Sequence, residues 1–86
     1  MLMVTIEDLQ WIKVSKYRLK ILFVLKDKLK SPRELEKELN IKLSHISRSL
    51  SQLSLKRYVE DKTPNLGRNK LYAITKKGGE VLKKID

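Results

Sequence analysis

Cysteine is absent from this 86-residue sequence, and apolar residues nowhere form a long run. The first absence excludes disulfide bonds, thiolate catalysis and cysteine-ligated zinc sites. The longest apolar run, Ile21–Leu25, is far shorter than the roughly 20 residues that a membrane-spanning helix needs. Residues 1–14 include Glu7 and Asp8 and lack the continuous apolar segment of a signal peptide. We therefore expect a protein that stays in the cytoplasm and makes no contact with a membrane.

Groups that carry out catalysis are also scarce. The chain has one histidine, His45, and its carboxylates in residues 34–38 occupy capping and helix-surface positions. These residues form no dyad, triad or metal-ligand spacing. We expect no enzymatic activity, no cofactor and no bound metal.

Acidic residues are outnumbered two to one, because 20 Lys and Arg stand against 10 Asp and Glu, for a net charge of +10 at pH 7. The excess is uneven, with +3 in residues 1–40 and +7 in residues 41–86. A field of this sign attracts polyanions such as DNA, RNA or an acidic membrane surface. The aromatic residues are too scattered to serve as stacking platforms for single-stranded bases. We expect all five to pack in the fold: Trp11, Tyr17, Phe23, Tyr58 and Tyr72.

Capping signals divide the first half of the chain into helices. Thr5, followed by Asp8, predicts the start of a helix over residues 5–13, and Ser15 begins a second, largely apolar helix that we expect to be central. The clearest signal is Ser31-Pro32-Arg33-Glu34, which combines a capping box with proline at the first helical position. Asn40 ends this third helix, since asparagine tolerates a left-handed backbone.

The second half predicts a longer helix followed by a hairpin. Residues 42–56 form a helix with an apolar stripe, and with the preceding helix they make a helix-turn-helix over about residues 31–57. Strands over 58–62 and 70–74 flank a turn and form a wing over about residues 58–75. Thr75 caps a last helix, 76–85, weakened by two glycines. The predicted fold class is mainly α with a small β-hairpin (α+β), and the predicted fold is a winged helix-turn-helix. We expect a single domain that spans residues 1–86.

The motifs of residues 15–82 follow one another in a specific order. They are Ser31-Pro32-x-x-Leu35-x-x-x-Leu39-Asn40-Ile41, Ile46-Ser47-Arg48-x-Leu50-x-x-Leu53, Tyr58-Val59, Gly67-Arg68, and Leu71-Tyr72-x-Ile74-Thr75-x-Lys77-Gly78. This set resembles the winged-helix regulators of the MarR and ArsR type, especially small archaeal members. The resemblance implies a transcription regulator that binds double-stranded DNA and is associated with the nucleoid when bound.

The chain departs from these families at particular positions. Glu36 stands where helix-turn-helix proteins usually have a small residue, and an unpaired carboxylate there would be costly to bury. Arg57 replaces the glycine that commonly ends the recognition helix. The chain lacks the long flanking helices of full MarR proteins, so the resemblance does not imply their ligand pocket. It also lacks the cysteine metal site of many ArsR proteins, so the resemblance does not imply metal sensing.

The predicted recognition helix, 42–56, presents a polar face suited to the major groove. On a helical wheel Ser44, Arg48 and Ser51 point away from the apolar stripe. Arg48 can form a bidentate bond to guanine, while short hydroxyls allow close approach. Lys42 opens the helix, and His45 and Ser47 flank its outer face. The alternative is a solvated polar face, with His45 serving only to cap or pack.

Other candidate contacts lie outside this helix. The wing, residues 63–70, presents Arg68, Asn69 and Lys70 to the minor groove or flanking phosphates, unless it is only a basic solubilising turn. Ser31 and Arg33 can bind a backbone phosphate, although capping alone is a sufficient role for Ser31.

Several functions fit this sequence. We expect a homodimer that binds a specific operator, dimerised through the terminal helices 5–13 and 76–85 with Trp11, Leu82 and Ile85. A chromatin or architectural protein with little sequence preference, a protein-interaction module, and a binder of double-stranded RNA or left-handed DNA are the alternatives. Leu55 is an apolar residue on the outer side of the predicted recognition helix. Either fraying of the helix end or a contact with a partner accounts for its position.

Overall fold

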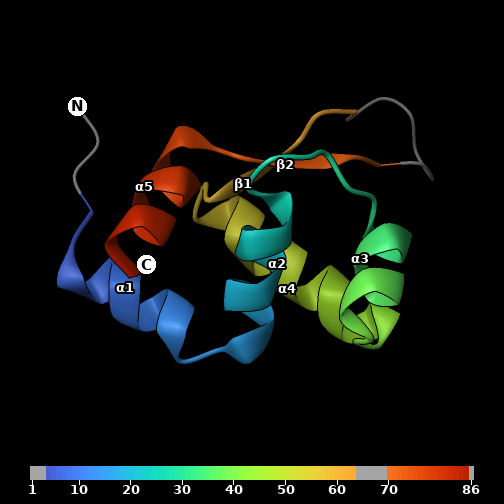
Figure 1. Ribbon diagram of the computed structural model, residues 1–86, viewed down its shortest axis with the longest axis horizontal. Coiled ribbons are helices and arrows are strands. Elements are labelled where there is room, and N and C mark those ends of the chain that lie inside the picture. The colour runs from blue at the N-terminus through green and yellow to red at the C-terminus, as the bar shows by residue number, and fades with distance from the viewer. Residues whose placement is uncertain (1–3, 64–69, 86) are drawn as a thin grey trace.

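The computed structural model describes residues 4–63 and 70–85 and confirms the expected order of elements (Figure 1). Helices α1 and α5 lie side by side at one end of the molecule, and α3 lies at the other. The elements are α1 (Ile6–Lys13), α2 (Lys16–Leu25), α3 (Pro32–Leu39), α4 (Leu43–Leu55), β1 (Val59–Asp61), β2 (Tyr72–Ile74) and α5 (Lys76–Ile85).

The helices begin at the residues that the capping signals predicted. Thr5 and Ser31 each accept from the backbone amide three residues later, and the acidic side chain at that later position accepts from their own backbone amides. Thr75 caps α5 by accepting from the amide of Gly78. Asn40 ends α3 in the left-handed conformation, with φ 56° and ψ 45°. Local capping chemistry therefore places four of the helix ends.

The hairpin is antiparallel and pairs Val59 with Ile74 at its base. Its strands are shorter than the predicted ranges 58–62 and 70–74, because the chain is still turning out of α4 just before Val59. Lys30, in the loop before α3, exchanges two backbone hydrogen bonds with Tyr72 and so covers the outer edge of β2. An exposed strand edge invites pairing with other chains, and here part of it is occupied.

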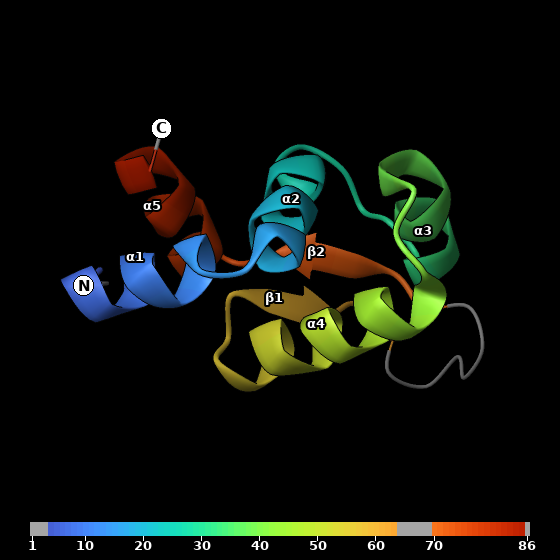
Figure 2. The same ribbon diagram turned by 90° about the horizontal axis from the view of Figure 1, so that it is seen from below.

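Helix α2 is central, as its apolar composition predicted, and it contacts α1, α3, α4, α5 and β2. Figure 2 shows α4 running along one side of the molecule beneath α2 and α3. Two of the aromatic residues expected to pack are exposed instead, Tyr17 and Phe23, because α2 turns these positions to solvent. The buried core consists of Ile12, Ile21, Leu22, Leu25, Leu35, Ile41, Ile46, Leu50, Leu53, Tyr58, Val59, Val81 and Leu82.

A polar and aromatic cluster ties α1 to the rest of the domain. The Tyr58 hydroxyl donates to the carboxylate of Asp8, and the Tyr58 ring stacks on Trp11 with centroids 5.5 Å apart. The guanidinium of Arg18 lies 3.8 Å from the centre of the Trp11 ring and donates to Trp11 O and to Gln52 Oε1. Arg18 of α2 thus joins Trp11 of α1 to Gln52 of α4.

The charge on Asp8 makes folding depend on pH. The backbone amide of Thr5 and the Tyr58 hydroxyl both donate to the carboxylate, and they hold the pKa of Asp8 below its ordinary value of 3.8. Its contribution to stability is therefore complete above that ordinary value and is lost as the pH falls through the lower folded pKa. We expect the free energy of unfolding, measured by urea denaturation from pH 6 to pH 2, to fall less steeply in Asp8→Asn than in the wild type.

Asp27→Asn is the matched control, because Asp27 is exposed and has no hydrogen bond or ion pair within the described residues. This control should keep the wild-type acid dependence. An identical acid profile for Asp8→Asn and wild type would contradict the role of Asp8.

Candidate nucleic-acid interface

Helix α4 is anchored by one apolar side. Ile46, Leu50 and Leu53 are buried, together with Ser49, and α4 packs on α2, α3 and β1. A wheel of 100° per residue then turns the remaining positions toward solvent. The orientation of the polar face follows directly from this burial.

The outer face of α4 carries side chains without partners. Ser44, Ser47, Arg48 and Ser51 are all exposed, as expected from the wheel, and within the described residues none of them forms a hydrogen bond or ion pair. Leu55 lies on the same side, one turn beyond Ser51, and is 84% exposed. Leu55 is the last residue of α4, so both fraying of the helix end and a partner contact stay open as reasons for this exposure. The face can therefore bind a ligand without first breaking contacts of its own.

His45 differs from these neighbours. It is half-buried, and its ring lies 5.1 Å from the ring of Tyr17, tilted by 34°. Tyr17 belongs to the first turn of α2, and no sequence signal pointed to it beyond its place after the Ser15 cap. His45 therefore packs against α2 through Tyr17, and a contact of its ring with DNA stays a prediction.

Glu36 has a structural role at the start of α4. Its carboxylate accepts from the backbone amide of Leu43 at 3.2 Å. Lys42, the residue before the helix, is exposed and supplies no side-chain cap of its own. The carboxylate that seemed costly to bury is thus paired, and it caps α4 from α3.

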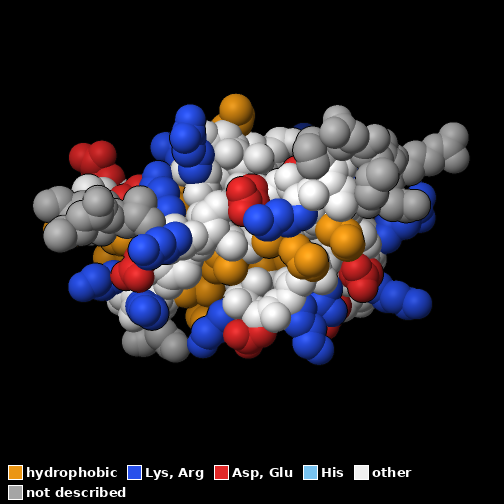
Figure 3. Space-filling view, turned by 90° about the horizontal axis from the view of Figure 1, so that it is seen from above, with side chains coloured by type: hydrophobic (Ala, Val, Ile, Leu, Met, Phe, Trp, Pro, Cys, Tyr) orange, Lys and Arg blue, Asp and Glu red, His pale blue; other side chains and the backbone are white. Residues whose placement is uncertain are grey.

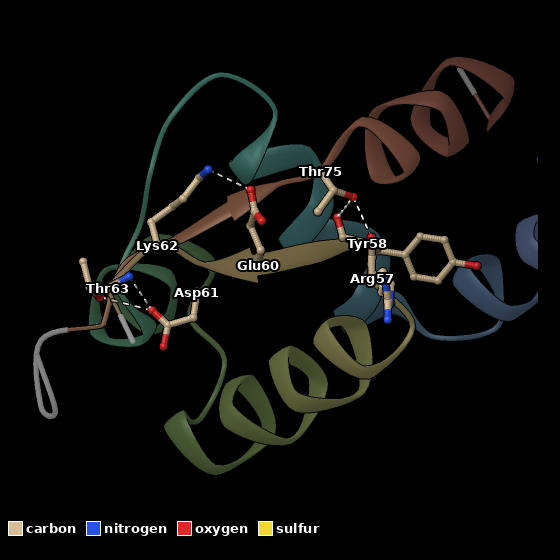
Figure 4. Close-up of polar contacts among 7 residues, drawn as sticks. All are labelled: Arg57, Tyr58, Glu60, Asp61, Lys62, Thr63 and Thr75. Carbon is tan, nitrogen blue, oxygen red and sulfur yellow. Dashed lines mark hydrogen bonds and ion pairs between the residues drawn. The ribbon is translucent and has the colours of Figure 1, made fainter. Parts of the chain in front are cut away.

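Arg57 provides the turn that glycine commonly makes after this helix. It adopts φ 66°, in the left-handed region, and its amide donates to Ser54 O at 3.0 Å. Figure 4 shows the Thr75 side chain beside this turn, where its hydroxyl donates to Arg57 O at 2.6 Å. Hydrogen bonds on both sides hold the strained residue in place.

The other predicted contact residues are spread over two segments. The Ser31 hydroxyl accepts from the Glu34 amide at 3.1 Å, so its capping role is filled, and the neighbouring Arg33 is exposed. Lys70 is exposed at the end of the wing nearest β2. Arg68 and Asn69 lie outside the described residues.

The basic side chain of α4 is not neutralised by an ion pair within the described residues. Within the described residues, the ion pairs are Lys30–Glu38, Lys62–Glu60 and Lys83–Glu80, so no cation of α4 is paired. On the hairpin side, Figure 3 shows basic side chains around the margin and also one beside an acidic side chain near the middle, next to a band of apolar side chains. In the described part of the chain, no three His, Cys, Asp or Glu side chains come together as a metal site. The same residues include no helix long and apolar enough to cross a membrane.

Of the three residues predicted to form the dimer surface of the terminal helices, Leu82 and Trp11 are held within the domain, and Ile85 is partly buried against its core. Leu82 is only 3% exposed and belongs to the core, and Trp11 is held between Tyr58 and Arg18. Both were assigned to an interface because a short chain was expected to have more apolar residues than one core needs. The exposed apolar residues of α1 and its C-terminal end are Ile6, at 71%, and Val14, at 77%.

Comparison with known proteins gives a consistent picture. Residues 14–78 match the family model of the winged helix DNA-binding domain. Apo MarR from E. coli is 28% identical, with a TM-score of 0.76 over 91% of this chain and 59% of that chain. Transcriptional regulator Tm0710 from Thermotoga maritima is 24% identical, with a TM-score of 0.76 over 92% of this chain and 56% of that chain.

A mutant of ZitR from Lactococcus lactis is 19% identical, with a TM-score of 0.73 over 83% of this chain and 49% of that chain. The chain thus spans about half to three fifths of the length of these three known structures. No curated protein sequence matches it.

Proposed function

The chain belongs to the winged helix DNA-binding domain family and is of the MarR type that its motifs predicted, and we propose a function from this membership. The protein is a transcription regulator that binds double-stranded DNA with sequence specificity. One observation carries the proposal. The outer face of α4 exposes Ser44, Arg48 and Ser51, and these side chains have no partner within the described residues. A preorganised face of this kind suits direct reading of base edges.

In the proposed complex, α4 lies in the major groove. Arg48, in the middle of the helix, donates two hydrogen bonds to a guanine, and the serine hydroxyls bond to neighbouring base edges. Leu55, exposed on the same side, makes an apolar contact with a thymine methyl group. Lys42, Lys70 and Arg33 neutralise phosphates and fix the register of the helix.

We further propose that the protein acts in the cytoplasm as a homodimer. Two recognition helices related by a two-fold axis would then enter major grooves about 34–36 Å apart. The end formed by α1 and α5 lies opposite α3 and exposes Ile6 and Val14, which supports it as the interface (Figure 1). Sedimentation in the presence of DNA reports the stoichiometry.

The test is a selection of random duplexes at physiological salt. An enriched palindrome supports operator binding by a dimer. Good affinity without any enriched sequence overturns specificity and favours an architectural protein, the candidate that the net charge of +10 supports. Failure to bind any duplex overturns the proposed function.

Binding to the selected duplex should depend strongly on salt. Each neutralised phosphate contributes about −0.9 to the slope of log affinity against log salt, because counterions are released from the DNA. Four such contacts give a loss of roughly 100-fold in affinity between 50 and 200 mM salt. Fluorescence anisotropy at several salt concentrations measures the slope, and a value near zero would exclude phosphate contacts as the source of affinity.

A further inference from the structure

A second basic surface lies where the end of α4 meets the start of α5. We call it the cationic corner, and it consists of Lys56, Arg57, Lys76 and Lys77. The two pairs are far apart in the sequence but are tied together, since Lys77 Nζ donates to Lys56 O at 3.0 Å. The Thr75 hydroxyl makes the second tie, because its single O–H is shared between Arg57 O at 2.6 Å and Tyr58 O at 3.0 Å (Figure 4).

The charges of the corner are not neutralised by ion pairs. Within the described residues, no carboxylate lies within ion-pair distance of any of the four side chains. Carboxylates flank the corner without pairing with it. Glu60 and Asp61 line the same hollow as Arg57, Lys76 and Lys77, and Glu60 pairs with Lys62 at 2.8 Å. Asp8 accepts from Thr5 and Tyr58, and the charge of Lys77 helps to lower its pKa.

Aromatic rings support two of the ammonium groups without cancelling their charge. Lys56 Nζ lies 5.0 Å from the centre of the Trp11 ring, and Lys77 Nζ lies 4.6 Å from that of Tyr58. Arg57 and Lys76 are exposed, and their side chains form no hydrogen bond, ion pair or ring contact within the described residues. The corner therefore combines two positioned cations with two free ones.

The corner lies just past the C-terminal end of α4, to one side of its outer face, because Lys56 comes about 100° after Leu55 on the helical wheel and its Nζ lies over Trp11. Ser44, Arg48, Ser51 and Leu55 lie along one side of the helix, and the corner begins at the next residue. Figure 2 shows the turn between α4 and β1 at the same side of the molecule as α4 itself. A duplex that receives the outer face of α4 thus passes the corner at the C-terminal end of that helix.

We propose that the cationic corner binds the phosphate backbone of the duplex beyond the groove that α4 occupies. This inference rests on the proposed function. Lysine ammonium groups and exposed guanidinium groups bind phosphates without reading sequence, so the corner adds affinity and register rather than specificity. It extends the contacted length of DNA past the segment read by α4.

The test compares wild type with the double variant Arg57→Asn/Lys76→Gln on two duplexes. Asparagine is chosen because it tolerates the left-handed backbone at position 57. One duplex is a single half-site of the selected sequence trimmed to its enriched bases, and the other is the same half-site with ten further base pairs on each side. The matched control, Lys83→Gln/Lys84→Gln, removes two positive charges from the other end of α5.

On the long duplex, the corner variant should lose about 2 from the salt slope, so wild-type affinity falls about tenfold more than that of the variant between 50 and 200 mM salt. On the trimmed duplex, the salt slopes of the corner variant and of wild type should agree, and the control should match wild type on both duplexes.

Equal salt slopes for the corner variant and wild type on the long duplex overturn the proposed phosphate contact of the corner while leaving the proposed function intact. An equal loss in the control also overturns it, because overall charge then suffices. If the double variant does not fold, the single variant Lys76→Gln replaces it in the test, and we expect it to lose about 1 from the salt slope on the long duplex.

Discussion

Arg48→Ala is expected to weaken binding to the selected operator by roughly 1–3 kcal/mol, or about 5- to 150-fold, with a much smaller effect on random duplex. Arg48 is exposed in the middle of α4 and has no hydrogen bond or ion pair within the described residues. We therefore expect the substitution to leave the fold intact and to delete the proposed base contact. Titrations of a fluorescent operator and of a scrambled duplex measure the two affinities.

Arg48→Lys is the matched control for this substitution. Lysine keeps the charge but not the planar fork that bonds to both acceptors of guanine. We expect it to restore binding to random duplex and to leave most of the operator affinity lost. Equal weakening of both duplexes by Arg48→Ala, with an unchanged circular dichroism spectrum, would show that α4 does not read bases and would favour an architectural protein.

Gly78→Ala is expected to lower the free energy of unfolding by about 1–3 kcal/mol, the usual cost of overpacking. An added Cβ would lie 2.3 Å from Tyr58 O and 2.7 Å from Ile74 Cγ1. The Tyr58 carbonyl cannot move aside easily, because it accepts from both the amide and the hydroxyl of Thr75. This clash outweighs the gain of about 1 kcal/mol that alanine brings to a helix interior.

Gly79→Ala should have the opposite effect. No atom lies within 4 Å of a Cβ built at this position, so the substitution keeps the gain in helix propensity of up to about 1 kcal/mol. Urea denaturation of both variants tests the pair. A similar change in stability for the two variants would mean that α5 does not pack on the Tyr58 backbone as described.

The helix ends and the orientation of α4 follow from short-range sequence patterns. The capping boxes at Thr5 and Ser31, the left-handed Asn40 and the apolar stripe of α4 each involve residues within one or two helical turns, so their physics is local. The same wheel placed Ser44, Arg48 and Ser51 on the exposed side. These patterns, in their order along the chain, were sufficient to predict the winged helix.

Tertiary packing decided the features that join distant residues. The Leu43 amide received its cap from Glu36, His45 met Tyr17, and Leu82 entered the core instead of a dimer surface. The two glycines of α5 looked equivalent in the sequence, yet only Gly78 faces the Tyr58 carbonyl. A periodic pattern reports which way a side chain points from its own helix, but not which backbone or side chain from another element lies there. The cationic corner depends on such a meeting, because it exists only once α5 has docked against the end of α4.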